Sequence, residues 1–90
     1  MLLRDVPFAA LRDLLLELGF AEQTVPKSAE TPVPGVAFHH AASDCFFVFR
    51  PYRPQDRVSL TDLVGVRSQL DWRGLLTEQA FDAALRKASA

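Results

Sequence analysis

Two adjacent residues, His39 and His40, are the only histidines in the chain. An imidazole changes its charge near neutral pH, so either residue could act as a general base. On a strand the two side chains would point to opposite faces and could not easily share a metal ion. Asp44 and Cys45 follow, but the spacing fits no standard zinc pattern. We therefore expect no metal and no other cofactor. The alternative to a catalytic base is a structural pair, with one histidine against the core and the other in solvent.

A second group combines arginine side chains with an aromatic ring in a proline-containing segment. Its members are Arg50, Tyr52, Arg53 and Arg57. Arginine can clamp a phosphate through two hydrogen bonds, and tyrosine can stack on a base, so the group predicts RNA binding. The alternative is a solvated loop with local pairing to Asp56. The net charge is −1, with a local excess of five arginines over three aspartates in residues 45–73. Proteins that bind nucleic acid mainly through phosphates are usually more basic overall.

The other reactive or aromatic side chains favour structural roles. Cys45 begins an apolar run without lysine or arginine within four positions, which is typical of a buried, inert thiol. Trp72 is expected to be a partly buried packing residue. A single cysteine favours a reducing compartment, and the apolar run of residues 45–49 is too short to cross a bilayer. We expect a cytoplasmic protein that does not contact a membrane.

Hydrophobic periodicity predicts six elements to position these residues. Ninety residues are enough for one domain, residues 1–90. A stripe of apolar side chains predicts a first helix, and prolines in residues 26–35 predict an irregular connection. The full set is a helix over 7–18, strands over 20–25, 36–41 and 45–50, and helices over 59–73 and 77–87. Short connections between consecutive strands favour an antiparallel meander with helices packed on it, an α+β fold of order α-β-β-β-α-α.

Local signals predict the ends and faces of the helices. Asp5 is expected to cap the first helix or to interact favourably with its dipole, and Gly19 to end it. Ser59 and Asp62 have the spacing of a capping box, and Thr77 can cap the last helix. The buried side of the second helix is expected to comprise Leu60, Leu63, Val64, Val66 and Leu70.

The third strand is apolar at every position from Cys45 to Phe49. Either helices cover both of its faces, or one face meets another chain. Left exposed, such a run would promote aggregation. The fold prediction depends on Phe46–Phe49 lying in the middle of the meander, shielded by amphipathic helices that precede and follow it. The same strand gives a functional hypothesis, a protein-interaction or self-assembling domain, for example a homodimer, without catalytic activity.

Several short segments resemble one known family. They are Leu18-Gly19-Phe20 after a leucine-rich helix, Gly35 with Phe38-His39-His40, and a helix with Leu63, Val66-Arg67-Ser68-Gln69-Leu70 and Gly74-Leu75. Over about residues 8–76 the chain resembles the HicA-type toxins, small bacterial messenger-RNA interferases. The resemblance implies a double-stranded-RNA-binding-domain-like fold, RNA as a ligand and an antitoxin-like protein partner. Residues 77–88 would be an added C-terminal helix.

The family's active residue is a histidine in a Gly-Ser-His triplet. Alignment on Gly35 gives Val36 and Ala37 in place of the serine and histidine, and alignment on Phe38 puts Gly35 at the histidine position. His39 or His40 would then be the only base. The resemblance therefore implies an RNA-binding module whose nuclease is degenerate or relocated. Like the fold prediction, it depends on Phe46–Phe49 lying shielded in the middle of the meander.

Overall fold

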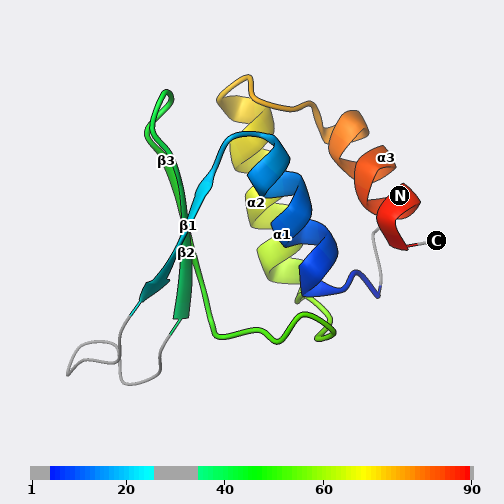
Figure 1. Ribbon diagram of the computed structural model, residues 1–90. Coiled ribbons are helices and arrows are strands. Elements are labelled where there is room, and N and C mark those ends of the chain that lie inside the picture. The colour runs from blue at the N-terminus through cyan, green and yellow to red at the C-terminus, as the bar shows by residue number, and fades with distance from the viewer. Residues whose placement is uncertain (1–4, 26–34, 90) are drawn as a thin grey trace.

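The computed structural model describes residues 5–25 and 35–89, and within them it contains three helices and one sheet (Figure 1). The elements are α1 Phe8–Glu17, β1 Ala21–Val25, β2 Gly35–His40, β3 Cys45–Phe49, α2 Leu60–Trp72 and α3 Glu78–Ser89. The sheet is antiparallel with the order β1-β2-β3. The predicted α+β class and the order α-β-β-β-α-α are confirmed. The irregular connection predicted for residues 26–35 lies outside the described residues, except for Gly35, which begins β2.

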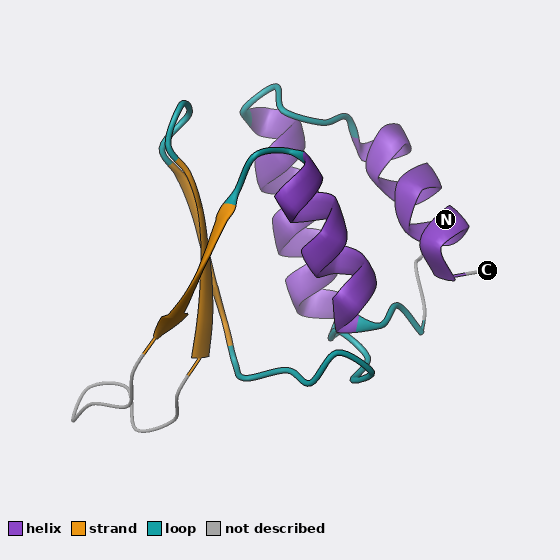
Figure 2. Ribbon diagram, viewed as in Figure 1, coloured by secondary structure: helices purple, strands orange, loops and turns teal. Residues whose placement is uncertain are grey.

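The elements form layers, with the sheet on one side and the helices on the other (Figures 1 and 2). Helices α1 and α2 lie against one face of the sheet, which we call the inner face. Helix α3 lies beyond them, on the side away from the sheet. No described element covers the opposite face, which we call the outer face. No helix in the described ranges is long and apolar enough to cross a bilayer.

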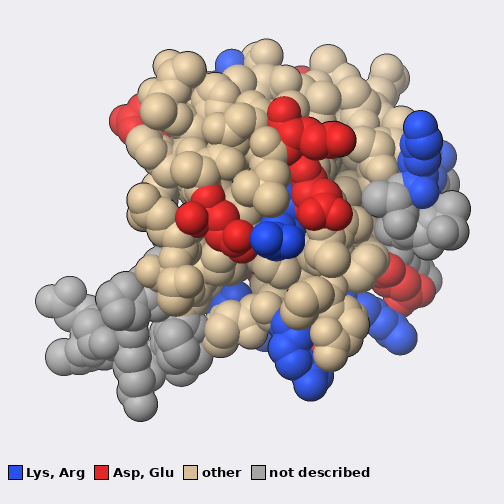
Figure 3. Space-filling view, viewed as in Figure 1, with Lys and Arg blue, Asp and Glu red and all other residues tan. Residues whose placement is uncertain are grey.

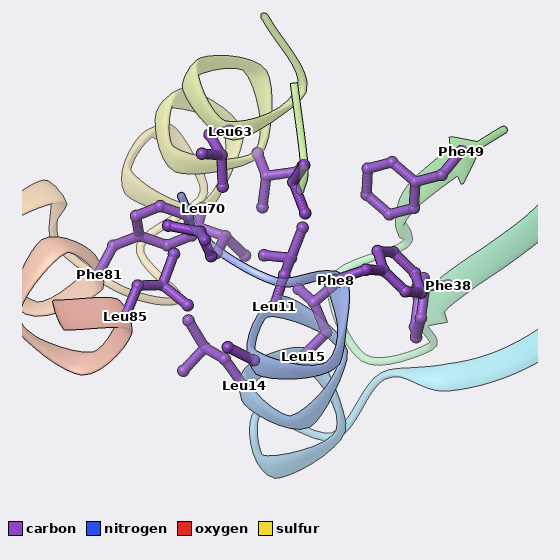
Figure 4. Packing of buried hydrophobic residues seen from close by; sticks show 14 of the residues in the cluster. Phe8, Leu11, Leu14, Leu15, Phe38, Phe49, Leu63, Leu70, Phe81 and Leu85 are labelled. Atoms are coloured by element: carbon purple, nitrogen blue, oxygen red, sulfur yellow. The ribbon is translucent and has the colours of Figure 1, made fainter. Parts of the chain in front are cut away.

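The core lies between these layers, and α1 runs through its centre (Figure 4). Phe38, on the inner face of β2, is fully buried with its ring centroid 6.2 Å from that of Phe8 and 5.8 Å from that of Phe49. On the other side of α1, Phe81 and Leu85 of α3 are also fully buried. The last helix therefore shares one core with the rest of the chain.

The start of α1 differs from the prediction. Asp5 does not cap the helix, because it lies before the first turn with a φ of 56°. The N-cap residue is a proline without a side-chain acceptor. The N–H groups of Phe8 and Ala9 instead donate to the carbonyl oxygens of Asp56 and Pro54, at 2.8 and 3.0 Å. The loop that contains the arginines thus caps α1, which sequence spacing could not indicate.

The other caps are confirmed. The Oγ of Ser59 accepts a hydrogen bond of 3.2 Å from the N–H of Asp62 at the start of α2. Thr77 accepts one of 3.1 Å from the N–H three residues further on. Gly19 and Gly74 follow α1 and α2 with φ values of 99° and 74°, a conformation that glycine adopts without strain.

The predicted buried side of α2 is wrong at two positions. Leu63, Val66 and Leu70 reach the core, but Leu60 and Val64 are exposed at 47% and 39%. Trp72, expected to pack partly buried, is 80% exposed. It follows Leu63 by nine residues, which places it about 180° around the helix from the buried side.

The expected position of the third strand is also wrong. β2 is the middle strand, and β3 lies at an edge. Cys45 and Phe49 are buried on the inner face, whereas Phe46 and Val48 point to the outer face and are exposed. Helices cover β3 on one face only, because α1, α2 and α3 all lie on the same side of the sheet. The described helices therefore rule out the first alternative for this strand, in which helices cover both of its faces.

Candidate functional site

The outer face of the sheet carries a small apolar surface. The strand register aligns Ala21, His39 and Phe46 in one row and Gln23, Ala37 and Val48 in the next. Phe46 is 54% exposed and Val48 is 55% exposed. We call the exposed side chains Ala21, Phe46 and Val48 the outer-face patch; Ala37, next to Val48 in the same row, is only 3% exposed. Exposed large apolar side chains that lie next to each other are typical of interaction surfaces.

The two edges of the sheet differ in polarity. The β1 edge carries Glu22, Gln23 and Thr24, and the Arg12 guanidinium of α1 binds the Glu22 carboxylate at 3.0 Å. Charged and polar residues on an edge strand oppose pairing with another chain. The β3 edge has no charge between Cys45 and Phe49. The sheet is therefore protected at one edge and open at the other.

The two histidines lie on opposite faces. His39 is on the outer face, where its Nε2 lies 3.0 Å from Oδ1 of Asp44 and its ring centroid is 6.0 Å from that of Phe46. His40 is on the inner face, with its ring centroid 5.1 Å from that of Phe20. Nδ1 of His40 lies 2.8 Å from the Oγ of Ser43. Each imidazole therefore has a polar partner within its own chain, Asp44 for His39 and Ser43 for His40. The structure does not bring the two rings together, and their assignment as catalytic bases remains a prediction.

Two arginines of the predicted RNA-binding group pair with carboxylates. The backbone N–H and the guanidinium of Arg53 both donate to the Asp56 carboxylate, at 2.9 and 3.2 Å. Both contacts lower the pKa of the Asp56 carboxyl, and the backbone hydrogen bond from Arg53 has a larger effect than its guanidinium. Arg57 lies 2.9 Å from the Asp5 carboxylate. Both arginine side chains are nevertheless well exposed, at 73% and 77%.

Tyr52 has a structural position in the same loop. Its ring stacks on that of Phe8, with centroids 5.1 Å apart. Its hydroxyl donates to Oδ2 of Asp62 at 2.6 Å and accepts from the N–H of Ser59 at 3.1 Å. In a capping box the residue equivalent to Asp62 would bind that N–H itself. Tyr52 thus completes the start of α2, and Arg50, whose guanidinium lies 5.5 Å from its ring centroid, packs on it from outside.

Cys45 is buried, as predicted, with 1% of its surface exposed. Burial raises the pKa of its thiol, and the nearby Arg73 guanidinium lowers it by less. A thiol with a raised pKa is a poor nucleophile near neutral pH. Among the described residues, histidine, cysteine and acidic side chains form no group of three that could hold a metal ion.

Arg73 joins the end of α2 to the turn between β2 and β3. Its Nη1 donates to the carbonyl oxygen of Ser43 at 3.0 Å, and its guanidinium lies 5.8 Å from the ring centroid of Trp72. This contact fixes the turn that precedes β3. A separate groove of about 500 Å³ lies between α1 and α3 and is lined by Ala10, Asp13, Leu14, Glu17, Ala84 and Lys87.

Charge does not gather into a broad basic area on the part of the surface drawn in Figure 3, where acidic and basic side chains are interspersed. The outer-face patch, by contrast, has two large apolar side chains exposed on one strand. Sequence reasoning identified β3 as unusual but could not tell its two faces apart. The comparisons of this chain with protein-family models, curated proteins and solved structures found no match.

Proposed function

We propose that the protein is a cytoplasmic protein-interaction domain without catalytic activity, and that it binds through the outer-face patch and the edge of β3. The observation that carries this proposal is the exposure of Phe46 and Val48, at 54% and 55%, on an edge strand without charges. The partner is a second copy of the chain or an antitoxin-like protein.

The side chains of this surface supply part of the free energy that offsets the entropy lost on association. Full burial of one large apolar side chain contributes about 1.5–3 kcal/mol, so covering the exposed half of Phe46 and of Val48 contributes about 1 kcal/mol each. Pairing of the β3 edge would add backbone hydrogen bonds, each worth about 1 kcal/mol net. The lack of a catalytic role is supported by the buried position of Cys45 and by the local partners of the two imidazoles, Asp44 for His39 and Ser43 for His40.

The test replaces Phe46 and Val48 together by lysine, a residue that natural edge strands use against pairing. The wild type should self-associate with rising concentration in sedimentation experiments, or should co-purify with a stoichiometric partner. The double variant should lose the association, with the dissociation constant raised by roughly 100-fold if about 2–3 kcal/mol is lost.

The matched control replaces Leu60 and Val64 by lysine. These side chains are exposed to a similar degree, at 47% and 39%, but lie on α2. The control should associate like the wild type. A wild type that stays monomeric at every concentration and has no stoichiometric partner would rule out the proposal.

RNA binding is the second proposal. Its support is the resemblance to HicA-type toxins and the exposed guanidinium groups of Arg50, Arg53 and Arg57 on one loop. The support is weaker than for protein binding. Arg53 and Arg57 are paired with carboxylates, the ring and hydroxyl of Tyr52 are engaged in the fold, and β3 lacks the shielding that we expected with the resemblance.

Salt dependence tests this second proposal. If the loop holds phosphates, affinity for single-stranded RNA should fall steeply with salt, and the slope should flatten by about two when all three arginines are replaced by alanine. RNA cleavage by the wild type, compared with His39→Ala and His40→Ala, tests the predicted base in the same assay. A lack of RNA affinity even at low salt would exclude this function.

A further inference from the structure

The open edge of β3 is bounded by two opposite charges at equal distances from its centre. Asp44 lies three positions before Phe47, and Arg50 lies three positions after it. Between them the strand has only apolar residues. The Asp44 side chain is 91% exposed, although its carboxylate also lies 3.0 Å from Nε2 of His39 in the same chain. Arg50 is exposed as well, with its guanidinium 5.5 Å from the ring centroid of Tyr52. A strand with this pattern is complementary to its own antiparallel copy, because residues at equal distances from the centre meet across the pair.

We propose that the partner is a second copy of this chain, bound by antiparallel pairing of β3 with β3 across a two-fold axis at Phe47. The inference rests on the proposed function, because it uses the same surface. In this register Asp44 of each copy lies opposite Arg50 of the other, so two pairs of opposite charge close the ends of the interface. Phe46 lies opposite Val48 of the second copy on the outer face, and Cys45 lies opposite Phe49 on the inner face.

Other registers fit less well. A shift of the axis to a point between two residues would place Phe46 opposite Phe47. One of these side chains points to the outer face and the other to the inner face, so such a pair cannot form in a continuous sheet. An axis at Phe46 or at Val48 keeps the faces matched but separates Asp44 from Arg50. The register centred on Phe47 satisfies both the faces and the charges.

The assembly should stop at two copies. Pairing of β3 with β3 joins two sheets of order β1-β2-β3 into one, whose outer edges are both β1. Those edges carry Glu22, Gln23 and Thr24, which oppose further strand addition. An isologous two-fold contact is closed, and a net charge of −1 per chain gives little repulsion between the copies. The expected product is a soluble dimer and not a fibre.

The decisive experiment exchanges the two charges between copies. Asp44→Lys alone places lysine opposite Arg50, and Arg50→Asp alone places aspartate opposite Asp44, so each variant alone should have a dissociation constant raised about tenfold or more. A mixture of the two variants makes both end pairs attractive again, and should form a heterodimer with nearly wild-type affinity. Sedimentation with one variant fluorescently labelled measures this directly. As a control, Asp71→Lys and Arg86→Asp, alone or mixed, should dimerise like the wild type.

A second measurement does not depend on position 44, where the φ of 54° favours aspartate over lysine. Phe46→Cys and Val48→Cys proteins are oxidised separately and as a mixture. The mixture should give mainly the disulfide between positions 46 and 48, because directly opposed residues lie within disulfide range. Identical positions lie diagonally about 7–8 Å apart, which is too far.

The outcomes separate this inference from the proposed function. One outcome would keep the surface but reject the β3 register. In it, lysine at positions 46 and 48 abolishes association, but the charge variants dimerise like the wild type and the mixture of cysteine variants gives no preferred disulfide. If the wild type binds only a different protein, the second copy is wrong although the surface is confirmed. A wild-type monomer without any partner overturns both.

Discussion

Phe81→Ala should lower the free energy of unfolding by about 3–5 kcal/mol, the range for removing a fully buried phenylalanine ring. Phe81 lies on α3 and has no exposed surface, and the described part of the chain packs α1 and α2 against that helix. Such a loss is large for a domain of this size, whose total stability is about 5–15 kcal/mol. Thermal or denaturant unfolding followed by circular dichroism measures it.

The control for this prediction is Gln79→Ala, an exposed position two residues earlier on α3. It should change the unfolding free energy by less than about 0.5 kcal/mol. The comparison decides whether α3 is an integral part of the domain. If Phe81→Ala costs as little as the control, the helix over residues 77–88 contributes little to the stability of the domain.

Phe38→Ala should be as destabilising, at about 3–5 kcal/mol, whereas Phe46→Ala should cost the monomer less than about 1 kcal/mol. The two phenylalanines lie on neighbouring strands but on opposite faces of the sheet. Phe38 is completely buried between Phe8 and Phe49, and Phe46 is 54% exposed. The test is urea unfolding of both variants at a protein concentration where the wild type is monomeric.

Concentration gives this pair of variants a second use. At concentrations where the wild type associates, Phe46→Ala should lose stability relative to the wild type, because only the associated form buries that ring. Phe38→Ala should show the same deficit at every concentration. If Phe46→Ala is strongly destabilising in the monomer, the outer face is not the open surface described above.

The open outer face connects the fold to the proposed function. Three helices lie on one side of a three-stranded sheet, and the described residues provide nothing to cover the other side. The Arg73 side chain holds the turn that precedes β3, and Tyr52 holds the loop that follows it. Both ends of the strand are thus fixed before a partner arrives. Because β3 is already ordered, this side of the interface loses less conformational entropy when a partner strand binds.

Sequence alone determined the elements and their order, because periodicity and caps are local. The apolar stripe from Phe8 to Leu15, the glycines after α1 and α2, and the Ser59 and Thr77 caps all act within a few residues. The class and the meander follow from them. The burial of Cys45 was also predicted, because this thiol begins an apolar run and has no lysine or arginine within four positions.

Only the tertiary structure decided which face of β3 is covered and what the loop residues do. An apolar run such as Cys45–Phe49 has no alternation from which a buried face could be recognised, and the side on which α2 and α3 return depends on packing across the whole chain. The capping of α1 by the carbonyls of Pro54 and Asp56, and the contact between Tyr52 and Phe8, likewise join residues 44 to 48 positions apart. Such contacts reflect three-dimensional packing, which local spacing cannot specify.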